Sequence, residues 1–230
     1  MHITILLLAA GSGSRFGSDI PKQYVSIHGL PLLVHCLNSL ACESRIRCIQ
    51  PVIAEGDRQF QKAIEGHNFP FHLLEPVTGG AERGQSMASG LAALPAEAAW
   101  VAVHDAARPV PSPALLGDVF DTAERYGAAI PGLAVHDTIK QIDEEGKVVS
   151  TLDRARLRAV QTPQVAHRSW FEQAVKLQQE SLCQYTDDAA LLEAAGFDVY
   201  LSQGDVLNRK VTTREDMEWL SNVLEKAAAK

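Results

Sequence analysis

The sequence predicts an α/β protein built on a doubly wound, mostly parallel β-sheet. Apolar strand candidates alternate with helical segments along most of the chain, which is the pattern of parallel sheets covered by helices on both faces. The first strand candidate, Ile3 to Leu8, is apolar or β-branched throughout, as expected of a strand that is buried on both sides. Small or polar residues follow several strand ends, where such sheets bind their ligands. Together these observations predict a Rossmann-like fold.

The strands and helices follow from local hydrophobic patterns. Short apolar runs bounded by polar or turn residues predict strands at residues 3–8, 46–53, 71–74, 100–104, 128–131 and 198–201. Apolar residues at helical spacing predict helices at residues 32–40, 57–65, 86–94, 113–126, 168–179, 187–195 and 214–229. No linker, internal repeat or low-complexity tract divides the 230 residues, so we expect one domain spanning residues 1–230.

Residues 138–161 interrupt this alternation. The extended segments Thr138–Ile142 and Lys147–Leu152 flank Asp143-Glu144-Glu145-Gly146, which has the composition of a hairpin turn. An isolated two-stranded ribbon is only marginally stable in water. We therefore predict that residues 138–161 form a protruding β-hairpin arm that packs against a second subunit, which makes the protein a homodimer.

The loop after the first strand indicates a site for an anion. Its residues have almost no side-chain bulk, so backbone N–H groups can approach a phosphate closely. These small residues are Ala9, Ala10, Gly11 and Gly13. Arg15 and Lys22 add positive charge beside them, which suits the triphosphate of a nucleotide. A tight turn between strand and helix with two solvated cations is the alternative.

Two common phosphate-binding motifs do not match this loop. Its glycines, Gly11, Gly13 and Gly17, are spaced one residue too widely for the dinucleotide fingerprint. After Asp19 no acidic residue follows until Glu43, so the ribose anchor of that fingerprint is missing as well. No Gly-Lys-Ser/Thr sequence follows the loop, which excludes a P-loop.

Three further segments carry candidate chemistry. Asp105 ends a buried strand and could be a hard oxygen ligand for Mg²⁺ with phosphates, or simply the cap of a helix. The segment from Gly79 to Ser86 could hold a base or ribose through its backbone, or form a capped turn. Lys210 precedes an apolar, β-branched pair, where a lone lysine is usually a solvated charge.

Composition limits the partners and the compartment. The formal net charge is −7, which argues against a protein that binds nucleic acid through phosphate contacts. The four cysteines show no Cys-x-x-Cys spacing, as expected of reduced thiols in a cytoplasmic protein. The N-terminal apolar run lacks a basic flank and is too short to span a bilayer, so we expect no export signal and no membrane partner.

Eight motifs in order along nearly the whole chain resemble the 2-C-methyl-D-erythritol 4-phosphate cytidylyltransferase family of the non-mevalonate isoprenoid pathway. The motifs are Ala-Ala-Gly-x-Gly-x-Arg (9–15), Pro-Lys-Gln-Tyr (21–24), Gly-Gly-x-Glu-Arg-x-x-Ser (79–86), Val-His-Asp-Ala-Ala-Arg-Pro (103–109), Asp-Thr-Ile-Lys (137–140), Asp-Arg (153–154), Gln-Thr-Pro-Gln (161–164) and Lys-Val-Thr (210–212). Position 81 is Ala81, where some members of the family carry a polar side chain, so base contacts there would come from the backbone. The resemblance implies a single nucleotidyltransferase domain, residues 1–230, with no fused cyclase domain.

The resemblance also implies roles for particular residues. CTP and methylerythritol phosphate would give a CDP-linked alcohol and pyrophosphate. The catalytic residues around the reacting phosphates would be Arg15, Lys22 and Lys210. The nucleotide would be bound by Ala9, Ala10, Gly11, Gly13, Gly80, Ala81, Arg83, Ser86 and Asp105, with Mg²⁺ as cofactor at Asp105. Methylerythritol phosphate would be bound by Arg108, Thr138, Arg154 and Thr162, with active sites shared between the two subunits of a homodimer.

Two other functions remain open at this stage. A cytidylyltransferase for another polyol phosphate, such as ribitol 5-phosphate, would share most of these motifs. A non-catalytic nucleotide-binding regulator would keep the glycine loop, but it need not keep Lys22, Asp105 and Lys210 together. The presence of all three disfavours the regulator.

Overall fold

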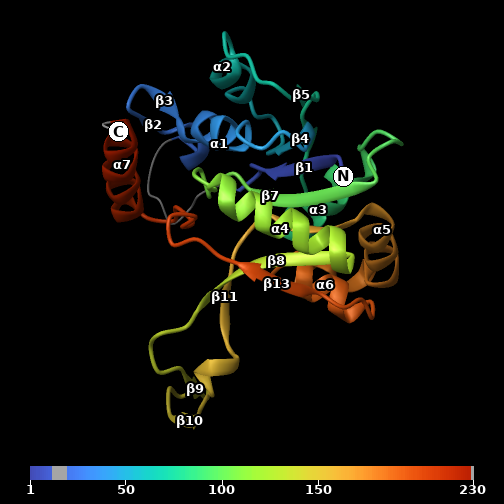
Figure 1. Ribbon diagram of the computed structural model, residues 1–230, viewed down its shortest axis with the longest axis vertical. Coiled ribbons are helices and arrows are strands. Elements are labelled where there is room, and N and C mark those ends of the chain that lie inside the picture. Colours follow the sequence, from blue (N-terminus) through green and yellow to red (C-terminus); the bar gives the residue numbers. More distant parts are fainter. Residues whose placement is uncertain (12–19, 229–230) are drawn as a thin grey trace.

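A nine-stranded sheet lies at the centre of the molecule (Figure 1). The computed structural model describes residues 1–11 and 20–228. The strands of this sheet are β1 (Ile3–Leu8), β4 (Ile46–Ile53), β5 (His72–Leu73), β6 (Val77–Thr78), β7 (Trp100–Asp105), β8 (Ala128–Ala134), β11 (Arg158–Val160), β12 (Gln164–His167) and β13 (Tyr200–Gln203). They follow the order β11-β8-β12-β7-β1-β4-β5, with β13 beside β8 and β6 beside β4. Only β11 and β12 pair antiparallel with their neighbours among the described strands of this sheet, so the predicted mostly parallel sheet is confirmed.

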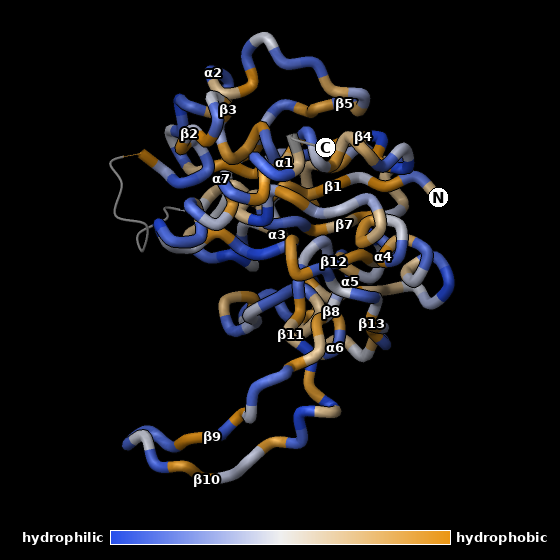
Figure 2. The backbone as a smooth tube through the Cα atoms, turned by 60° about the vertical axis from the view of Figure 1, so that its left-hand side comes forward, coloured by the Kyte–Doolittle hydropathy of each residue, from blue (hydrophilic) through white to orange (hydrophobic). Residues whose placement is uncertain are grey.

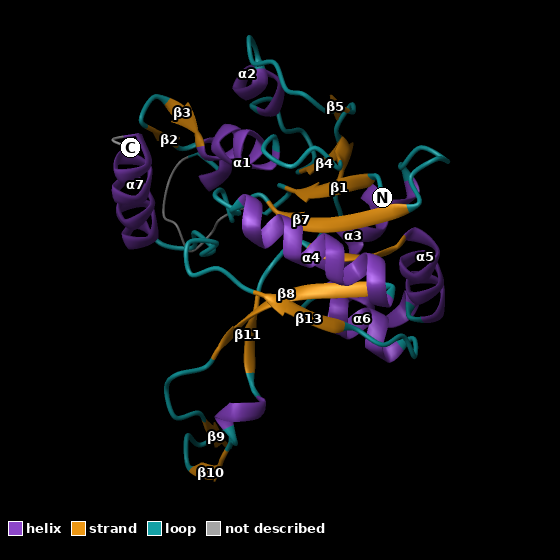
Figure 3. Cartoon of the chain, viewed as in Figure 1, coloured by secondary structure: helices purple, strands orange, loops and turns teal. Residues whose placement is uncertain are grey.

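Helices cover both faces of the sheet (Figure 3). They are α1 (Leu32–Leu40), α2 (Phe60–Ile64), α3 (Arg83–Ala92), α4 (Pro113–Tyr126), α5 (Arg168–Leu177), α6 (Asp188–Ala194) and α7 (Arg214–Ala228). Alternate residues of β1 enter different cores, because successive side chains of a strand point to opposite faces. Ile5 packs with α1 and α4, whereas Leu6 packs with α3 and α5. The doubly wound arrangement follows directly from these two cores.

A third apolar cluster joins the two ends of the chain. Ile27 and Leu32 pack there against Val211, Met217 and Leu220. Burial of these side chains removes apolar surface from water and fixes α7 against the segment that follows the N-terminal loop. As a result, Lys22 and Lys210 are held on the same side of the molecule although 188 positions separate them in the sequence.

The predicted hairpin arm is present and projects from the body (Figures 1 and 2). Its strands, β9 (Lys140–Ile142) and β10 (Val148–Thr151), pair with each other and with no other strand of the described chain. The arm is shorter than predicted, because residues 158–160 form β11 and pair with β8 in the main sheet. Apolar side chains on the arm are exposed, including Ile142 at 59%, Val148 at 53% and Val149 at 61%. Packing of this arm against a second subunit stays a prediction.

No helix in the described ranges has both the length and the apolar character needed to cross a membrane.

Candidate active site

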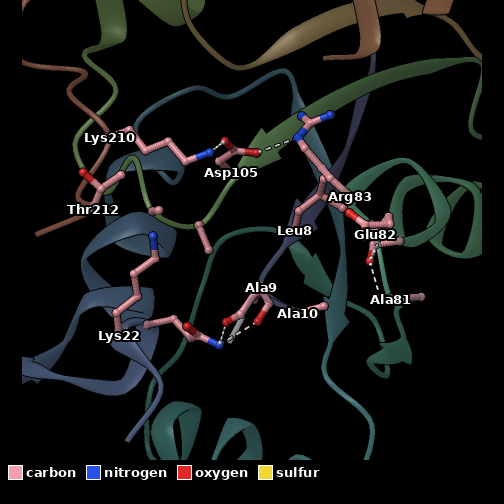
Figure 4. Close-up of a pocket in the computed structure, with 16 residues that line it drawn as sticks. Leu8, Ala9, Ala10, Lys22, Ala81, Glu82, Arg83, Asp105, Lys210 and Thr212 are labelled. Carbon is pink, nitrogen blue, oxygen red and sulfur yellow. Dashed lines mark hydrogen bonds and ion pairs between the residues drawn. The ribbon is translucent and has the colours of Figure 1, made fainter. Parts of the chain in front are cut away.

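A cavity of about 310 Å³ lies at the carboxyl ends of β1 and β7 (Figure 4). Leu8 and Asp105 are paired at the ends of these two adjacent parallel strands, so the residues that follow them enter the same space. This is where open α/β sheets bind ligands. Ten predicted site residues line the cavity: Ala9, Ala10, Gly11, Lys22, Gly80, Ala81, Arg83, Ser86, Asp105 and Lys210. Gly13 and Arg15 lie outside the described residues.

The segment before α3 forms one wall of the cavity. A Cβ atom on Gly79 would lie 2.6 Å from the Ser86 Oγ and 2.8 Å from the Ala10 Cβ, so only glycine permits this close approach. Glu82 caps the helix, and its backbone N–H donates to the Gln85 Oε1 at 3.2 Å. The segment is therefore a capped turn and also a wall of the cavity.

The opposite wall is held by two adjacent residues of the short 3₁₀ turn η2 (Lys22–Tyr24). The buried Gln23 donates from Nε2 to the carbonyl oxygens of Ala9 at 2.7 Å and Gly11 at 3.4 Å. Lys22 donates from Nζ to the carbonyl oxygen of Val211 at 2.8 Å. The first contact fixes the loop after β1, and the second joins Lys22 to the segment that carries Lys210.

Asp105 is the centre of charge in the cavity. Its Oδ2 accepts from the Lys210 Nζ at 2.6 Å, and its Oδ1 accepts from the Arg83 Nε at 3.3 Å (Figure 4). Burial alone would raise the pKa of Asp105, but the charges of Arg83 and Lys210 outweigh it and hold this pKa well below its usual range. Asp105 is therefore ionised at neutral pH.

A hydrogen-bonded group behind Asp105 fixes the loop that follows β7. The Thr162 Oγ1 accepts from the Asp105 backbone N–H at 3.1 Å. The His104 Nε2 donates to the carbonyl oxygen of Arg108 at 3.0 Å, because a carbonyl can only accept. The neutral ring then accepts at Nδ1 from the Thr162 hydroxyl at 3.0 Å. Thr162 and Arg108, two predicted substrate residues, support this loop and do not line the cavity.

The other two predicted substrate residues lie at the arm. Arg154 donates from Nη1 to the carbonyl oxygen of His136, and both Thr138 and Arg154 are exposed. Neither lines the cavity of its own chain. Their predicted role therefore depends on a second subunit.

Four residues that the sequence analysis did not assign also belong to this site. They are Gln23, Glu82, Asp188 and Thr212. Gln23, Glu82 and Thr212 stand inside motifs of the resemblance, so their positions could have indicated a role. Asp188 follows another aspartate at the start of a helix, where the sequence indicates no more than a cap.

The donor atoms at Asp105 fit a magnesium ion only if the ion arrives with a nucleotide. No group of three His, Cys, Asp or Glu side chains suitable for a metal occurs among residues 1–11 and 20–228. Mg²⁺ bound to a nucleotide takes most of its ligands from phosphates and water, with one or two protein carboxylates. The single carboxylate of Asp105 satisfies that requirement.

The fold and the cavity define an α/β protein with a ligand-sized cavity at its strand ends, made from a small-residue loop, two lysines and a buried carboxylate. The chain belongs to the 2-C-methyl-D-erythritol 4-phosphate cytidylyltransferase family, which residues 3–226 match. The resemblance seen in the sequence is thereby confirmed.

Individual relatives agree with this assignment. A 2-C-methyl-D-erythritol 4-phosphate cytidylyltransferase of Desulforamulus reducens is 37% identical over 94% of this chain and 93% of the relative. A bifunctional enzyme IspD/IspF of Nitrobacter winogradskyi is 41% identical over 92% of this chain. The match covers 53% of that enzyme, so this chain spans about half the length of such bifunctional relatives.

Solved structures have the same fold. The 4-diphosphocytidyl-2C-methyl-D-erythritol synthase of Anaerococcus prevotii superposes with a TM-score of 0.84 at 26% identity, covering 97% of this chain and 98% of that one. The 2-C-methyl-D-erythritol 4-phosphate cytidylyltransferase of Thermus thermophilus gives a TM-score of 0.77 at 29% identity, covering 98% of this chain and all of that one (100%).

Proposed function

We propose that the protein transfers the cytidylyl group of CTP to 2-C-methyl-D-erythritol 4-phosphate, giving 4-diphosphocytidyl-2-C-methyl-D-erythritol and pyrophosphate. Family membership over residues 3–226 supports this reaction. The observation that carries the proposal is that Lys22, Asp105 and Lys210, from three distant segments, meet at one cavity beside a small-residue loop. A non-catalytic regulator would have no need for this combination of side chains.

The chemical step is an in-line substitution at phosphorus. A phosphate oxygen of methylerythritol phosphate forms a bond to the α-phosphorus of CTP, and the bond from that phosphorus to the pyrophosphate oxygen breaks. The attacking phosphate is already ionised near neutral pH, so no general base is needed. Positioning of the two phosphates and stabilisation of the developing charge then supply the rate enhancement. Lys22, Lys210 and Arg15 bind the oxygens on which that charge gathers.

The nucleotide is bound by backbone and small side chains. The loop from Ala9 to Gly11 and the segment from Gly80 to Ser86 hold cytidine, since Gly11, Gly80 and Ala81 leave room for it. Bound Mg²⁺ would neutralise charge on the triphosphate, with Asp105 as its protein ligand. Lys210 exchanges its contact with Asp105 for the phosphate oxygens when the nucleotide binds.

The protein works as a homodimer in the cytoplasm. Its exposed apolar arm supports the homodimer, because an isolated two-stranded ribbon is only marginally stable in water. A two-fold dimer makes both sites equivalent, and the exposed Arg154 of each arm then serves the partner's methylerythritol phosphate. All four cysteines are unpaired, which suits a reducing compartment.

A pyrophosphate-release assay tests the reaction. CTP, ATP, GTP and UTP are each combined with methylerythritol phosphate and with ribitol 5-phosphate. Release with CTP and methylerythritol phosphate alone supports the proposal. Faster release with ribitol 5-phosphate would assign the protein to another polyol phosphate, and no release with any pair would overturn the enzymatic function.

A mixing experiment tests the shared site. Lys22→Ala and Arg154→Ala, each nearly inactive, are dissociated together and reassociated. If Arg154 acts in the partner's site, each mixed dimer contains one intact site and one doubly damaged site. Random pairing makes about half of the dimers mixed, so activity should recover to roughly a quarter of the wild-type value. No recovery would mean that Arg154 acts within its own chain.

A further inference from the structure

Arg83 is held by a second carboxylate, Asp188, on the side away from the cavity centre. Its Nη1 and Nη2 donate to Asp188 Oδ1 at 2.8 Å and Oδ2 at 2.7 Å, while its Nε donates to the Asp105 Oδ1 at 3.3 Å. Two parallel N–H···O bonds between a guanidinium and a carboxylate fix both groups in one plane. All three guanidinium nitrogens are therefore used by carboxylates of the protein.

Asp188 is itself rigidly placed. It is only 2% exposed and begins α6, directly after the helix cap Asp187. Asp187 accepts from the Ala190 N–H at 3.0 Å and from the Gln164 Nε2 at 3.0 Å. These bonds join the start of α6 to the central strand β12, so Asp188 cannot follow Arg83 if that side chain moves.

Lys210, Asp105, Arg83 and Asp188 form a row of alternating charges. Their formal charges sum to zero, and Asp105 divides its two oxygens between the two cations. Burial raises the pKa of Asp188, and the charge of Arg83 offsets only part of that rise. Both carboxylate oxygens accept from the guanidinium, which is the geometry of an ion pair. Without the charge of Asp188, the row would carry one net positive charge, because Arg83 and Lys210 would share Asp105 alone.

We propose that Asp188 is a positioning residue for cytidylyl transfer: it holds Arg83 on Asp105 when Lys210 leaves that carboxylate for the phosphates of CTP. This role rests on the function proposed above. An Asp105 carboxylate without a cationic partner would repel the triphosphate, whereas Arg83 neutralises its charge and fixes its orientation. An Arg83 released from Asp188 turns to Asp105 with both ends of its fork, or to the triphosphate itself. Either movement displaces the groups that orient Lys210.

The kinetic consequence is a separation of kcat from KM. Asp188→Asn adds one net positive charge near the cavity, which does not weaken binding of an anionic nucleotide. The misplaced Asp105 and Lys210 reduce the rate of the chemical step. We expect kcat to fall about 10²-fold, the typical cost of a misplacement of about 1 Å in an active site. KM for CTP should stay within about threefold of the wild-type value.

Two further variants separate positioning from folding. Glu193→Gln is the matched control, because it removes one carboxylate charge from an exposed position of the same helix, α6; its kcat should stay within about threefold of wild type. The double variant Arg83→Gln with Asp188→Asn removes the partly buried cation and the buried carboxylate together, which avoids leaving either one unpaired. Its thermal unfolding should return toward the wild-type midpoint, while kcat stays about 10²-fold low because Asp105 has lost Arg83.

The positioning role of Asp188 is tested by steady-state kinetics with CTP and methylerythritol phosphate. The unfolding midpoint of each variant is measured alongside. The inference is overturned if Asp188→Asn keeps its kcat, if Glu193→Gln loses as much, or if the double variant recovers activity along with stability. A wild-type protein with no turnover would instead overturn the proposed function and this role with it.

Discussion

Acid should destabilise this protein through His104, a fully buried ring beside the active site. Burial lowers the pKa of His104 from 6.5 to about 4, because the charged imidazolium is disfavoured away from water. The neutral ring also fits its partners, since it accepts from Thr162 at Nδ1 and donates to the carbonyl of Arg108 at Nε2. In the unfolded chain His104 takes up a proton near pH 6.5, whereas the folded protein resists it until about pH 4.

The sign and size of the effect follow from linkage. Between these two values the unfolded state binds more protons, so the free energy of unfolding decreases as the pH falls. The difference of about 2.5 pKa units corresponds to about 3 kcal/mol at 1.36 kcal/mol per unit. The contribution of the neutral His104 ring to the free energy of unfolding is complete above pH 6.5 and lost by about pH 4. Asp105, with its lowered pKa, loses its contribution only below its unfolded value of 3.8.

Urea unfolding between pH 7 and pH 4.5 measures this contribution. His104→Gln serves as the reference, because glutamine stays neutral over the whole range and can donate to the Arg108 carbonyl. Carboxylates such as Asp188 are present in both proteins, so their contribution cancels when the two free energies of unfolding are subtracted. The free energy of unfolding of the wild type should fall, relative to that of His104→Gln, by about 2 kcal/mol between pH 7 and pH 5. This follows because pH 5 lies about 1.5 units below the unfolded pKa of His104, at 1.36 kcal/mol per unit. A difference that does not change with pH would refute a neutral buried His104.

Three other variants test the site and the fold. Lys22→Ala should fold normally but lose roughly 10²–10³ in kcat, the usual cost of one preorganised donor; Lys62→Ala, an exposed lysine on α2, is the control, and a loss below about threefold for Lys22→Ala would exclude its catalytic role. Asp105→Asn should weaken the metal dependence, so that activity continues to rise with Mg²⁺ beyond the wild-type plateau; an unchanged titration would remove Asp105 from the metal site. Gly127→Ala should cost roughly 2 kcal/mol or more of unfolding free energy, because φ is +93° and the new Cβ would lie 2.2 Å from an aromatic ring of α5. Gly117→Ala, inside α4 with its nearest contact at 3.7 Å, should cost nothing, and equal urea midpoints for the two variants would contradict the reasoning.

Elements with strong local signals could be predicted from the sequence alone. Helix α4 begins and ends as expected, because Ser112 caps it, Pro113 occupies its first turn and Gly127 ends it with a positive φ. Strand β4 also has its predicted bounds, 46–53, since apolar residues dominate from Ile46 to Ile53 and the turn residues Glu55-Gly56 follow. In both cases the information that sets the boundary lies within a few residues of it.

Strand β12 was not predicted, and the reason is physical. It has only the four residues Gln164–His167, with polar residues at both ends, so its composition is that of a loop. It is a strand because β7 and β8 lie on either side of it and supply its hydrogen-bond partners. The same limit applies to β11, where pairing with β8 turns the end of the predicted arm into part of the sheet.

The residue types of the site could be predicted, but their pairing could not. Small loop residues and lysines have recognisable motifs, whereas Asp105–Lys210 and Arg83–Asp188 each join positions 105 residues apart. Nothing local to Asp188 distinguishes an anchor for an arginine from a second helix cap. Only the meeting of α3, α6, β7 and the segment before α7 in the folded chain creates the row of charges.

On the proposed function, the row of charges also explains how an acidic protein can bind a polyanion. The net charge is −7, so exposed cations alone would work against the field of the whole molecule. Before nucleotide binds, Lys210 and Arg83 are balanced by Asp105 and Asp188, and the cavity is spared the cost of unpaired, partly buried charges. A phosphate must therefore replace a carboxylate that already holds Lys210 at 2.6 Å. In the proposed reaction a single phosphate would offer little advantage over Asp105, whereas a triphosphate would engage both lysines at once. The exchange thus favours the complete substrate over smaller anions, and it requires that Asp105 keep a second cation when the first one leaves.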